Sequence, residues 1–377
     1  MKILITANSS WNVFHFRRPI LDALLADGHE VIILAPDDGY ESILESLGCQ
    51  FHALTIDLKG LSPARDFVLA LRMVRAFRKL RPDIVLSYTI KNNIYGAMAA
   101  RILGVPFIPT VTGLGTAFLS GPLLQTLVEA LCRIAFKASP FIFFQNGEDE
   151  KLFVSRALVR RQQVRRAPGS GIDLDYFRPM ETVAETRGPT FLMIARLLRD
   201  KGVLEYAEAA RRVLKRRPDA RFLMAGPVSP ENRSALGEDI IDIWRREGVI
   251  MHVGEARDIR PHIAAADCIV LPSYREGAPR TLIEASAMGK PVIATDVPGC
   301  RDVVVDGITG ILCRPRDAES LAEAMLRMIA MTGEKHAAMG AAGRARMAEH
   351  HDQRLVVKAY KAALTETASR GHEGLFS

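Results

Sequence analysis

Short apolar runs alternate with longer amphipathic stretches along the chain, and this alternation occurs as two separate series. The first series has apolar runs at 2–7, 30–35, 51–56, 84–88, 106–111 and 140–145. The second has them at 191–195, 221–225, 249–253, 268–272, 291–295 and 309–312. Helical patterns lie between the runs, for example over 62–80. Strands that alternate with helices predict parallel sheets, so we expect an α/β fold with two doubly wound, Rossmann-like domains.

A segment rich in glycine and proline separates the two series and divides the 377 residues into two domains. We expect an N-terminal domain over 1–170, a linker over 171–189 and a second domain over 190–355. The last stretch, 356–377, is expected to form a helix and tail that return to the first domain. Two such domains that face each other leave a cleft, and open α/β sheets bind ligands beyond the carboxyl ends of their strands.

Composition excludes several classes of protein. Hydrophobic residues make up 48% of the chain, which excludes intrinsic disorder. The five cysteines form no C-x-x-C pair, so we expect free thiols in a reducing cytosol and neither a zinc ribbon nor a disulfide framework. Glycines and prolines interrupt the uncharged run over 102–128, so no membrane-spanning helix is predicted.

Positive charge is concentrated in the first domain. Residues 59–137 carry 11 basic side chains against three acidic ones, a local balance of 11 − 3 = +8. Such a region is suited to an anionic lipid surface, and a solvated helical face is the alternative. The basic residues there are not interleaved with aromatic ones for base stacking, which disfavours nucleic acid as a partner.

The strongest candidate for a ligand site follows the apolar run 268–272. A turn rich in glycine and proline leads into a helix that we expect to start near Pro279, and the N-terminus of a helix favours phosphate. Glu276 and Glu284 have seven residues between them, a spacing that lets two carboxylates hold hydroxyls at two places on one extended ligand. The alternative is that Glu284 forms a surface ion pair with Arg280, four residues before it.

Other loops that follow apolar runs add cations and amides. Arg196 and Lys201 follow the first run of the second domain, and we expect them to clamp a diphosphate; solvated loop charges are the alternative. The turn after 2–7 is not G-x-G-x-x-G, so a dinucleotide oxidoreductase lacks its fingerprint. The acidic triplet 173–175 lies in the linker region, and no strong metal motif occurs, so no metal site is predicted.

On these loops the chain resembles the family-4 retaining glycosyltransferases of the GT-B type. The residues that carry the resemblance are 195–202, 273–280, 284–285 and 296–301 in the second domain. In the first domain they are 89–96, 111–115 and 144–146, and these are similar to a bacterial subgroup that acts on undecaprenyl-diphosphate-linked sugars. Two departures from the family pattern are Ala195, where glycine is common, and Lys91 with Asn92, where many relatives outside the subgroup have histidine.

The resemblance implies roles for individual residues. The expected catalytic residues are Arg196 and Lys201, which match the donor-diphosphate pair, and Glu276, which matches the contact to the transferred sugar. The expected donor-binding residues, with Glu284 on the ribose, are Gly277, Ala278, Arg280, Thr281 and Glu284. The loops after apolar runs of the first domain, and not the resemblance, lead us to expect acceptor binding by Asn12, Arg17, Lys91, Asn92 and Gly113. For Lys91, Asn92 and Gly113 the alternative is that their loops are turns that cap the core.

The resemblance also implies a reaction, in which an N-acetylhexosamine (GalNAc or GlcNAc) moves from a UDP-sugar to an undecaprenyl-diphosphate-linked sugar. No metal or other cofactor is expected. We expect the enzyme in the cytoplasm, peripheral on the inner face of the cytoplasmic membrane, with 59–137 toward the lipid and 114–128 inserted shallowly. The alternatives are a UDP-sugar epimerase of the same fold, which would change its donor without an acceptor, and a two-lobed sugar-binding protein.

Overall fold

The computed structural model describes residues 1–57, 62–113, 122–181, 188–228, 234–237 and 239–373. Its contacts divide the chain into two compact units. The first unit consists of Met1–Gly171 together with Gln353–Ser377, and the second is Ile172–Asp352. Most of the segment 171–189, which we expected as a linker, is therefore grouped with the second unit.

The first unit is built on one parallel sheet of seven strands in the order β3-β2-β1-β4-β5-β6-β7. The strands are β1 (Lys2–Thr6), β2 (Glu30–Ala35), β3 (Gln50–Ala53), β4 (Ile84–Tyr88), β5 (Phe107–Val111), β6 (Ile142–Phe144) and β7 (Val164–Arg166). The helices are α1 (Ser10–Ala26), α2 (Glu41–Ser46), α3 (Pro63–Leu80), α4 (Ile90–Leu103), α5 (Pro122–Ala135), α6 (Gly147–Ser155) and α14 (Gln353–Glu373). Short 3-10 helices cover Phe136–Ala138 and Arg161–Gln163.

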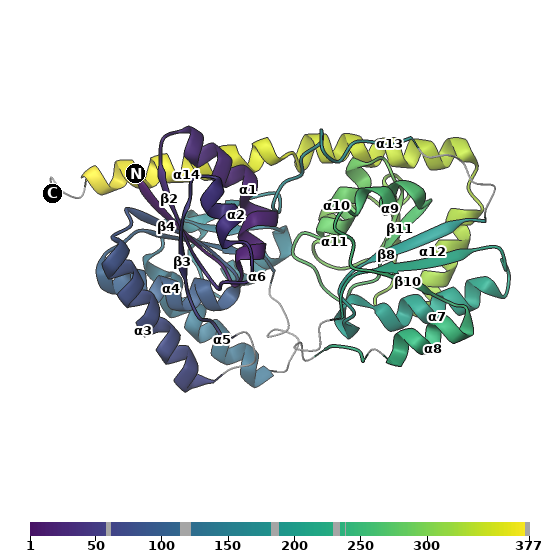
Figure 1. Cartoon of the computed structure of the whole chain (residues 1–377), viewed down its shortest axis with the longest axis horizontal. Coiled ribbons are helices and arrows are strands. Elements are labelled where there is room, and N and C mark those ends of the chain that lie inside the picture. The colour runs from purple at the N-terminus through teal and green to yellow at the C-terminus, as the bar shows by residue number, and fades with distance from the viewer. Residues whose placement is uncertain (58–61, 114–121, 182–187, 229–233, 238, 374–377) are drawn as a thin grey trace. The chain divides into compact units, whose positions relative to one another are not determined.

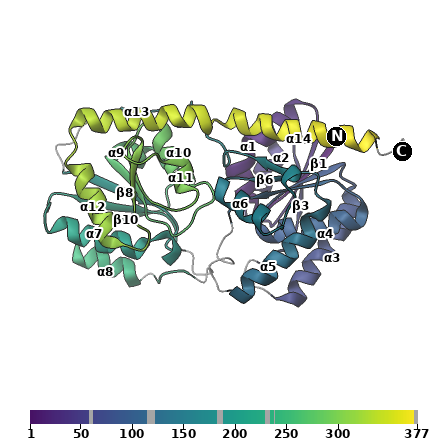
Figure 2. The same ribbon diagram turned by 180° about the vertical axis from the view of Figure 1, so that it is seen from behind.

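Both faces of this sheet are buried, because alternate strand residues point into two different hydrophobic clusters. In β1, Leu4 packs with α3, α4 and α5, whereas Ile3 and Ile5 pack with α1 and α14 on the other face. Figure 2 shows α3, α4 and α5 together on one side of the sheet. A sheet covered on both faces accounts for the nearly continuous apolar runs of the sequence.

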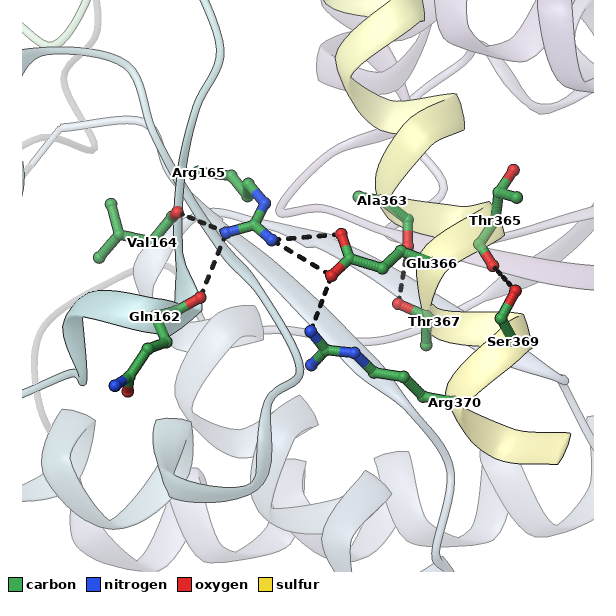
Figure 3. A network of polar contacts seen from close by, with 9 residues as sticks. All are labelled: Gln162, Val164, Arg165, Ala363, Thr365, Glu366, Thr367, Ser369 and Arg370. Carbon is green, nitrogen blue, oxygen red and sulfur yellow. Dashed lines mark hydrogen bonds and ion pairs between the residues drawn. The ribbon is translucent and has the colours of Figure 1, made fainter. Parts of the chain in front are cut away.

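Helix α14 belongs to the first unit, as predicted for the end of the chain. Its side chain Tyr360 stacks on Phe143, with ring centroids 4.3 Å apart, and its hydroxyl lies 2.6 Å from Oγ1 of Thr110. Near the end of the helix, Glu366 accepts hydrogen bonds from Arg165 of β7 at 3.2 Å and from Arg370 at 2.7 Å (Figure 3). Core packing and surface ion pairs therefore both hold α14 against this unit.

The second unit has a parallel sheet of six strands in the order β10-β9-β8-β11-β12-β13. The strands are β8 (Thr190–Ile194), β9 (Arg221–Ala225), β10 (Met251–Gly254), β11 (Cys268–Leu271), β12 (Val292–Thr295) and β13 (Gly310–Cys313). The helices are α7 (Val203–Leu214), α8 (Asp239–Glu247), α9 (Arg260–Ala265), α10 (Arg280–Ala287), α11 (Cys300–Val303), α12 (Ala318–Ile329) and α13 (Gly333–His350), with a 3-10 turn at Arg199–Lys201.

Helices again cover both faces of the second sheet. Helices α7, α8 and α12 pack on the face to which Phe191 and Met193 point, and α9 and α10 pack on the face of Leu192 (Figure 1). The prediction of two doubly wound parallel sheets is confirmed.

Candidate active site

Two loops of the second unit meet where its central strands β8 and β11 end. After β8 the next strand, β9, lies on one side of the pair, and after β11 the next strand, β12, lies on the other side. The strand order therefore reverses between β8 and β11, and this is the switch point of the sheet. The N–H of Tyr274 donates to the carbonyl oxygen of Asp200 at 2.9 Å. The hydroxyl of Thr281 donates to the carbonyl oxygen of Ile194 at 3.0 Å. One hydrogen bond therefore joins the loops over 195–202 and 272–279, and the other joins the strand and the helix that flank them, β8 and α10.

Two glycines let three loops approach each other closely. Gly202 has φ +73°, and a Cβ there would lie 2.0 Å from the carbonyl oxygen of Pro272. Gly299, after β12, has φ +79°, and a Cβ there would lie 2.5 Å from the carbonyl oxygen of Gly277 and 2.6 Å from that of Glu276. Both positions need glycine for conformation and for space. The sequence analysis did not predict this close approach at either glycine, although a glycine that follows a strand is a signal for it.

The side chains of Lys201 and Glu276 contact each other across this junction. The Lys201 ammonium lies 2.5 Å from Oε1 of Glu276, and these side chains are only 23% and 12% exposed. A charged hydrogen bond at this burial is stronger than a pair on the open surface. The two loops thus bring together a predicted phosphate-binding cation and a predicted sugar-binding carboxylate.

Glu284 lies in the second turn of α10 and is paired with Arg280, whose Nε donates to Oε1 at 2.6 Å. The carboxylate side chain is 12% exposed. Burial raises the pKa of Glu284 above its usual value of 4.5, against the opposing effect of Arg280. The ion pair that the sequence offered as an alternative is therefore present, and it holds a largely buried carboxylate beside the junction.

The start of helix α10 provides a positive end beside these side chains. The helix begins at Arg280, close to the predicted start, and its cap residue Pro279 offers no side-chain acceptor. Gly277 is buried, and Ala278 is partly buried against the core of the unit. Arg196 is exposed in the adjoining loop. A helix N-terminus with nearby cations is an arrangement that binds phosphate.

A hydrogen-bonded tyrosine supports the loop after β11. The hydroxyl of Tyr274 donates to Oε1 of Glu205 on α7 at 2.7 Å, and the guanidinium of Arg316 lies 4.6 Å from the centroid of the tyrosine ring. Burial and Glu205 together raise the pKa of Tyr274 to about 12. Thr295 donates to the carbonyl oxygen of Ser273 in the same loop. Sequence reasoning missed Glu205, because nothing in its spacing links α7 to a loop about 70 residues later.

The acidic triplet over 173–175 forms a turn of the backbone. Oδ1 of Asp173 accepts hydrogen bonds from the N–H groups of Asp175 and Tyr176, both at 3.0 Å. Within the ranges that the structure describes, no group of three or more His, Cys, Asp or Glu side chains is arranged to hold a metal ion.

Three acceptor-side candidates of the first unit are engaged in contacts within that unit. Arg17 is 2% exposed, with its guanidinium 3.9 Å from the centroid of the Tyr88 ring. Lys91 is paired with the buried Asp66 at 2.9 Å. Asn92 is fully buried and donates to Oγ1 of Thr6 at 2.8 Å. These contacts connect α1 with β4, and α4 with α3 and β1. The role of the three side chains in acceptor binding stays a prediction.

The other two acceptor-side candidates lie soon after the ends of β1 and β5. Asn12 is in the first turn of α1, where its N–H donates to Oγ of Ser9 at 3.0 Å. Gly113, with φ +129°, follows β5. Part of the stretch 114–128 that we expected at a lipid surface, 114–121, lies outside the described residues. No described helix is long and apolar enough to cross a membrane.

Comparison with known proteins matches both units. Residues 188–331 match the family model for glycosyl transferases group 1, and residues 2–146 match the model for glycosyl transferase 4-like proteins. The TuaC glycosyltransferase assigned to teichuronic acid biosynthesis in Bacillus subtilis (strain 168) is 32% identical over 74% of this chain and 69% of its own. The chain belongs to these group 1, family-4-like glycosyltransferases, and it is therefore an enzyme that transfers a sugar.

Two further similarities concern the full length of the chain. The N,N'-diacetylbacillosaminyl-diphospho-undecaprenol alpha-1,3-N-acetylgalactosaminyltransferase of Campylobacter jejuni is 26% identical over 96% of this chain and 97% of its own. The crystal structure of HepE from Anabaena in complex with UDP superposes with a TM-score of 0.77 at 18% identity, covering 97% of this chain and all of that one. The second similarity shows that the two-unit fold is that of a known structure.

Proposed function

We propose that this enzyme transfers an N-acetylhexosamine, GalNAc or GlcNAc, from a UDP-sugar to an undecaprenyl-diphosphate-linked sugar, with retention of configuration. The observation that carries the proposal is the junction of the loops after β8 and β11, where Lys201, Glu276 and the start of α10 meet. The acceptor follows from the similarity to the Campylobacter jejuni enzyme along nearly the whole chain. We propose that the reaction is a step in the biosynthesis of a bacterial surface glycan or glycoprotein oligosaccharide.

The junction is suited to the departure of a nucleoside diphosphate. As the bond between C1 of the sugar and the β-phosphate oxygen breaks, negative charge grows on the diphosphate. Arg196, Lys201 and the N-terminus of α10 stabilise that charge more in the transition state than in the ground state. When the donor binds, Lys201 exchanges its contact with Glu276 for the diphosphate, which leaves the carboxylate of Glu276 to accept from sugar hydroxyls. Glu284 accepts from the ribose.

The acceptor hydroxyl oxygen then forms the new bond to C1, and its proton passes to the leaving phosphate. This proton transfer needs no side-chain base. The proposed reaction uses no metal, because fixed cations neutralise the leaving group. We expect chelation of divalent ions with EDTA to leave the rate unchanged, and a rate that returns only when Mg²⁺ or Mn²⁺ is added would contradict this part.

Helix α3 supports a membrane-bound location for the enzyme. Its buried face carries Leu69, Met73 and Phe77, and its outward face exposes Phe67 to 64% and Leu71 to 40%. Exposed cations share that outward face, namely Arg72, Arg75, Arg78 and Lys79. The one acidic residue of the helix, Asp66, is buried. Apolar side chains among cations favour shallow insertion into an anionic lipid surface, where the lipid-linked acceptor would lie.

The experiment that tests the proposal is a donor screen. The protein is incubated with a panel of UDP-sugars, with and without membrane extract that holds lipid-linked saccharides, and released UDP and glycolipid products are measured. We expect UDP release from one UDP-N-acetylhexosamine that depends on the extract. A changed sugar nucleotide in reactions without extract would indicate the epimerase instead, and binding of a sugar without any product would indicate the binding protein.

A further inference from the structure

An aromatic cluster surrounds the first turns of helix α1, at the carboxyl end of β1. Trp11 and His15 have ring centroids 4.6 Å apart, and Tyr40 lies 5.2 Å from His15 and 5.4 Å from Phe14. Because Tyr40 follows β2, the strand beside β1, two loops at the same edge of the sheet build this cluster. The indole of Trp11 is 40% exposed.

Hydrogen bonds fix the backbone and the rim of this cluster. Asp38, in the loop after β2, accepts from the N–H of Trp11 at 3.1 Å and from the hydroxyl of Ser10. The hydroxyl of Tyr40 lies 3.2 Å from Nε2 of His15. The indole is therefore held by its backbone and its neighbours, and little conformational entropy is lost when a ligand covers it.

Two amide oxygens beside the cluster point to a missing hydrogen-bond donor. Oδ1 of Asn8 and Oδ1 of Asn12 are both shielded from solvent, and neither accepts a hydrogen bond from any residue that the structure describes. Shielded amide oxygens nearly always have a donor, so these two atoms indicate a ligand or water that donates hydroxyl hydrogens. They are independent of the aromatic side chains.

An exposed indole beside polar acceptors has the chemistry of a sugar-binding platform. One face of a pyranose ring carries C–H groups that pack on an aromatic ring, whereas its hydroxyls lie at the edge and require acceptors. Of the cluster, only Trp11 is a large hydrophobic side chain left exposed; Phe14 and Phe16 are partly buried. The exposed apolar area thus matches one or two sugar rings and is small for a protein interface.

The place of the cluster in the sheet suits a substrate. Strand β1 lies between β2 and β4, and the chain order reverses between β1 and β4, so the loop after β1 is at the switch point of this sheet. We propose that Trp11 is the platform on which the sugar of the acceptor stacks, with Asp38 accepting from its hydroxyls and with Asn8 and Asn12 turning their amide oxygens toward the sugar when it binds. This inference rests on the proposed function, since it states where the first unit binds the sugar of the acceptor.

Fluorescence tests the platform without turnover, because the chain has two tryptophans and the other one, Trp244, is 2% exposed in the second unit. A Trp244→Phe variant leaves Trp11 as the single indole. It is titrated with the methyl glycosides of GlcNAc, GalNAc, glucose and galactose, and with inorganic diphosphate. We expect a saturable change in emission with at least one glycoside and none with diphosphate. No saturable change with any glycoside would overturn the proposal.

Kinetics provides the second readout, with the lipid-linked acceptor identified in the donor screen. We expect Trp11→Ala to raise KM for the acceptor about tenfold, while kcat and KM for the UDP-sugar stay within about twofold. Trp11→Phe should recover part of the acceptor affinity, and Trp244→Phe is the matched control. An unchanged acceptor KM in Trp11→Ala would contradict the platform. Absence of transfer in the wild-type protein would instead contradict the proposed function, and the fluorescence titration still decides the platform.

Discussion

The ammonium of Lys91, in the first turn of α4, lies 2.9 Å from Oδ1 of Asp66 and 2.8 Å from the carbonyl oxygen of Asp57. Asp66 is on the buried side of α3 and is 4% exposed. The contact therefore ties the start of α4 to α3, the helix whose outward face we assign to the lipid surface. Among the described residues, Lys91 is the cation that is paired with the Asp66 carboxylate.

The first prediction concerns this buried pair. Lys91→Met leaves a buried carboxylate without its cation and should lower the free energy of unfolding by about 3 kcal/mol. The double variant Lys91→Met/Asp66→Leu should regain most of that loss, because both charges are then removed. Urea unfolding of the single and double variants measures both effects. Equal stability of Lys91→Met and the wild type would show that the pair contributes nothing.

The second prediction concerns the donor loop. Lys201→Ala should lower the rate of UDP release by about 10²–10³ at saturating donor, because a cation that stabilises the leaving group is lost. Arg199→Ala is the matched control, since Arg199 is an exposed cation of the same loop outside the proposed contacts, and it should stay within about twofold. Single-turnover UDP release measures both. Wild-type rates in Lys201→Ala would remove Lys201 from the mechanism.

The third prediction uses the raised pKa of Glu284. Between its usual value of 4.5 and its higher value in the folded protein, the folded state binds a proton that the unfolded state has lost. The free energy of unfolding therefore falls as pH rises through that interval. Glu284→Gln has no such proton, so its free energy of unfolding should rise relative to that of the wild type as pH rises from about 4 to 8. Donor use should be severely weakened in this variant.

Thermal unfolding of both proteins across this pH range, together with UDP release, measures the two effects separately. A constant difference in melting temperature at every pH would show that the carboxyl of Glu284 does not titrate differently in the folded protein. Retained UDP release at the wild-type rate would show that Glu284 does not hold the donor.

The fourth prediction concerns the contact between Tyr360 and Thr110, in which both side chains are buried. Tyr360→Phe should lower the stability of the first unit by about 1 kcal/mol, because Thr110 loses its partner. Hydrogen exchange should quicken in β4, β5 and α14 but not in β8 to β13. Ser369→Ala, on the exposed side of α14, is the control that should change neither region. Equal quickening of exchange in both units would contradict the assignment of α14 to the first.

The fifth prediction concerns the lipid surface. Reversal of two charges in Arg75→Glu/Arg78→Glu should lower binding to vesicles with anionic lipid at least about 30-fold, since each cation contributes about 1 kcal/mol. Lys215→Glu/Arg216→Glu changes the net charge equally from exposed positions of the second unit and should bind like the wild type. Sedimentation with anionic and neutral vesicles measures this. Similar losses in both variants would indicate a general charge effect instead of a face on α3.

Much of the architecture was predictable from the sequence, because buried parallel strands are continuous apolar runs. The helix expected over 62–80 is α3, Pro63–Leu80, and the uniform helical pattern near the end of the chain is α12, α13 and α14. Strand β7, Val164–Arg166, was not predicted, since an edge strand with two arginines has no apolar run. Its place follows from pairing with β6, which is a tertiary effect.

The candidate site was predictable as a set of loops but not as a set of contacts. Turn residues after strands identify the loops of Lys201 and Glu276, whereas their ion pair spans 75 positions and no local spacing indicates it. Burial was the harder property to predict. In the sequence Arg17 is one charged residue among others, yet its guanidinium is buried against Tyr88. A cation–π contact within a core leaves no periodic signal.

The assignment of α14 to the first unit has a consequence for how the protein is made. The ribosome completes the whole second unit before α14 emerges, so the second unit is able to fold while the first still lacks Val356, Tyr360, Ala363 and Leu364 from its core. The first unit is thus the last to mature although it is synthesised first. A premature stop before residue 353 would leave its sheet with an open apolar face, and such a product is a natural target for chaperones and proteases.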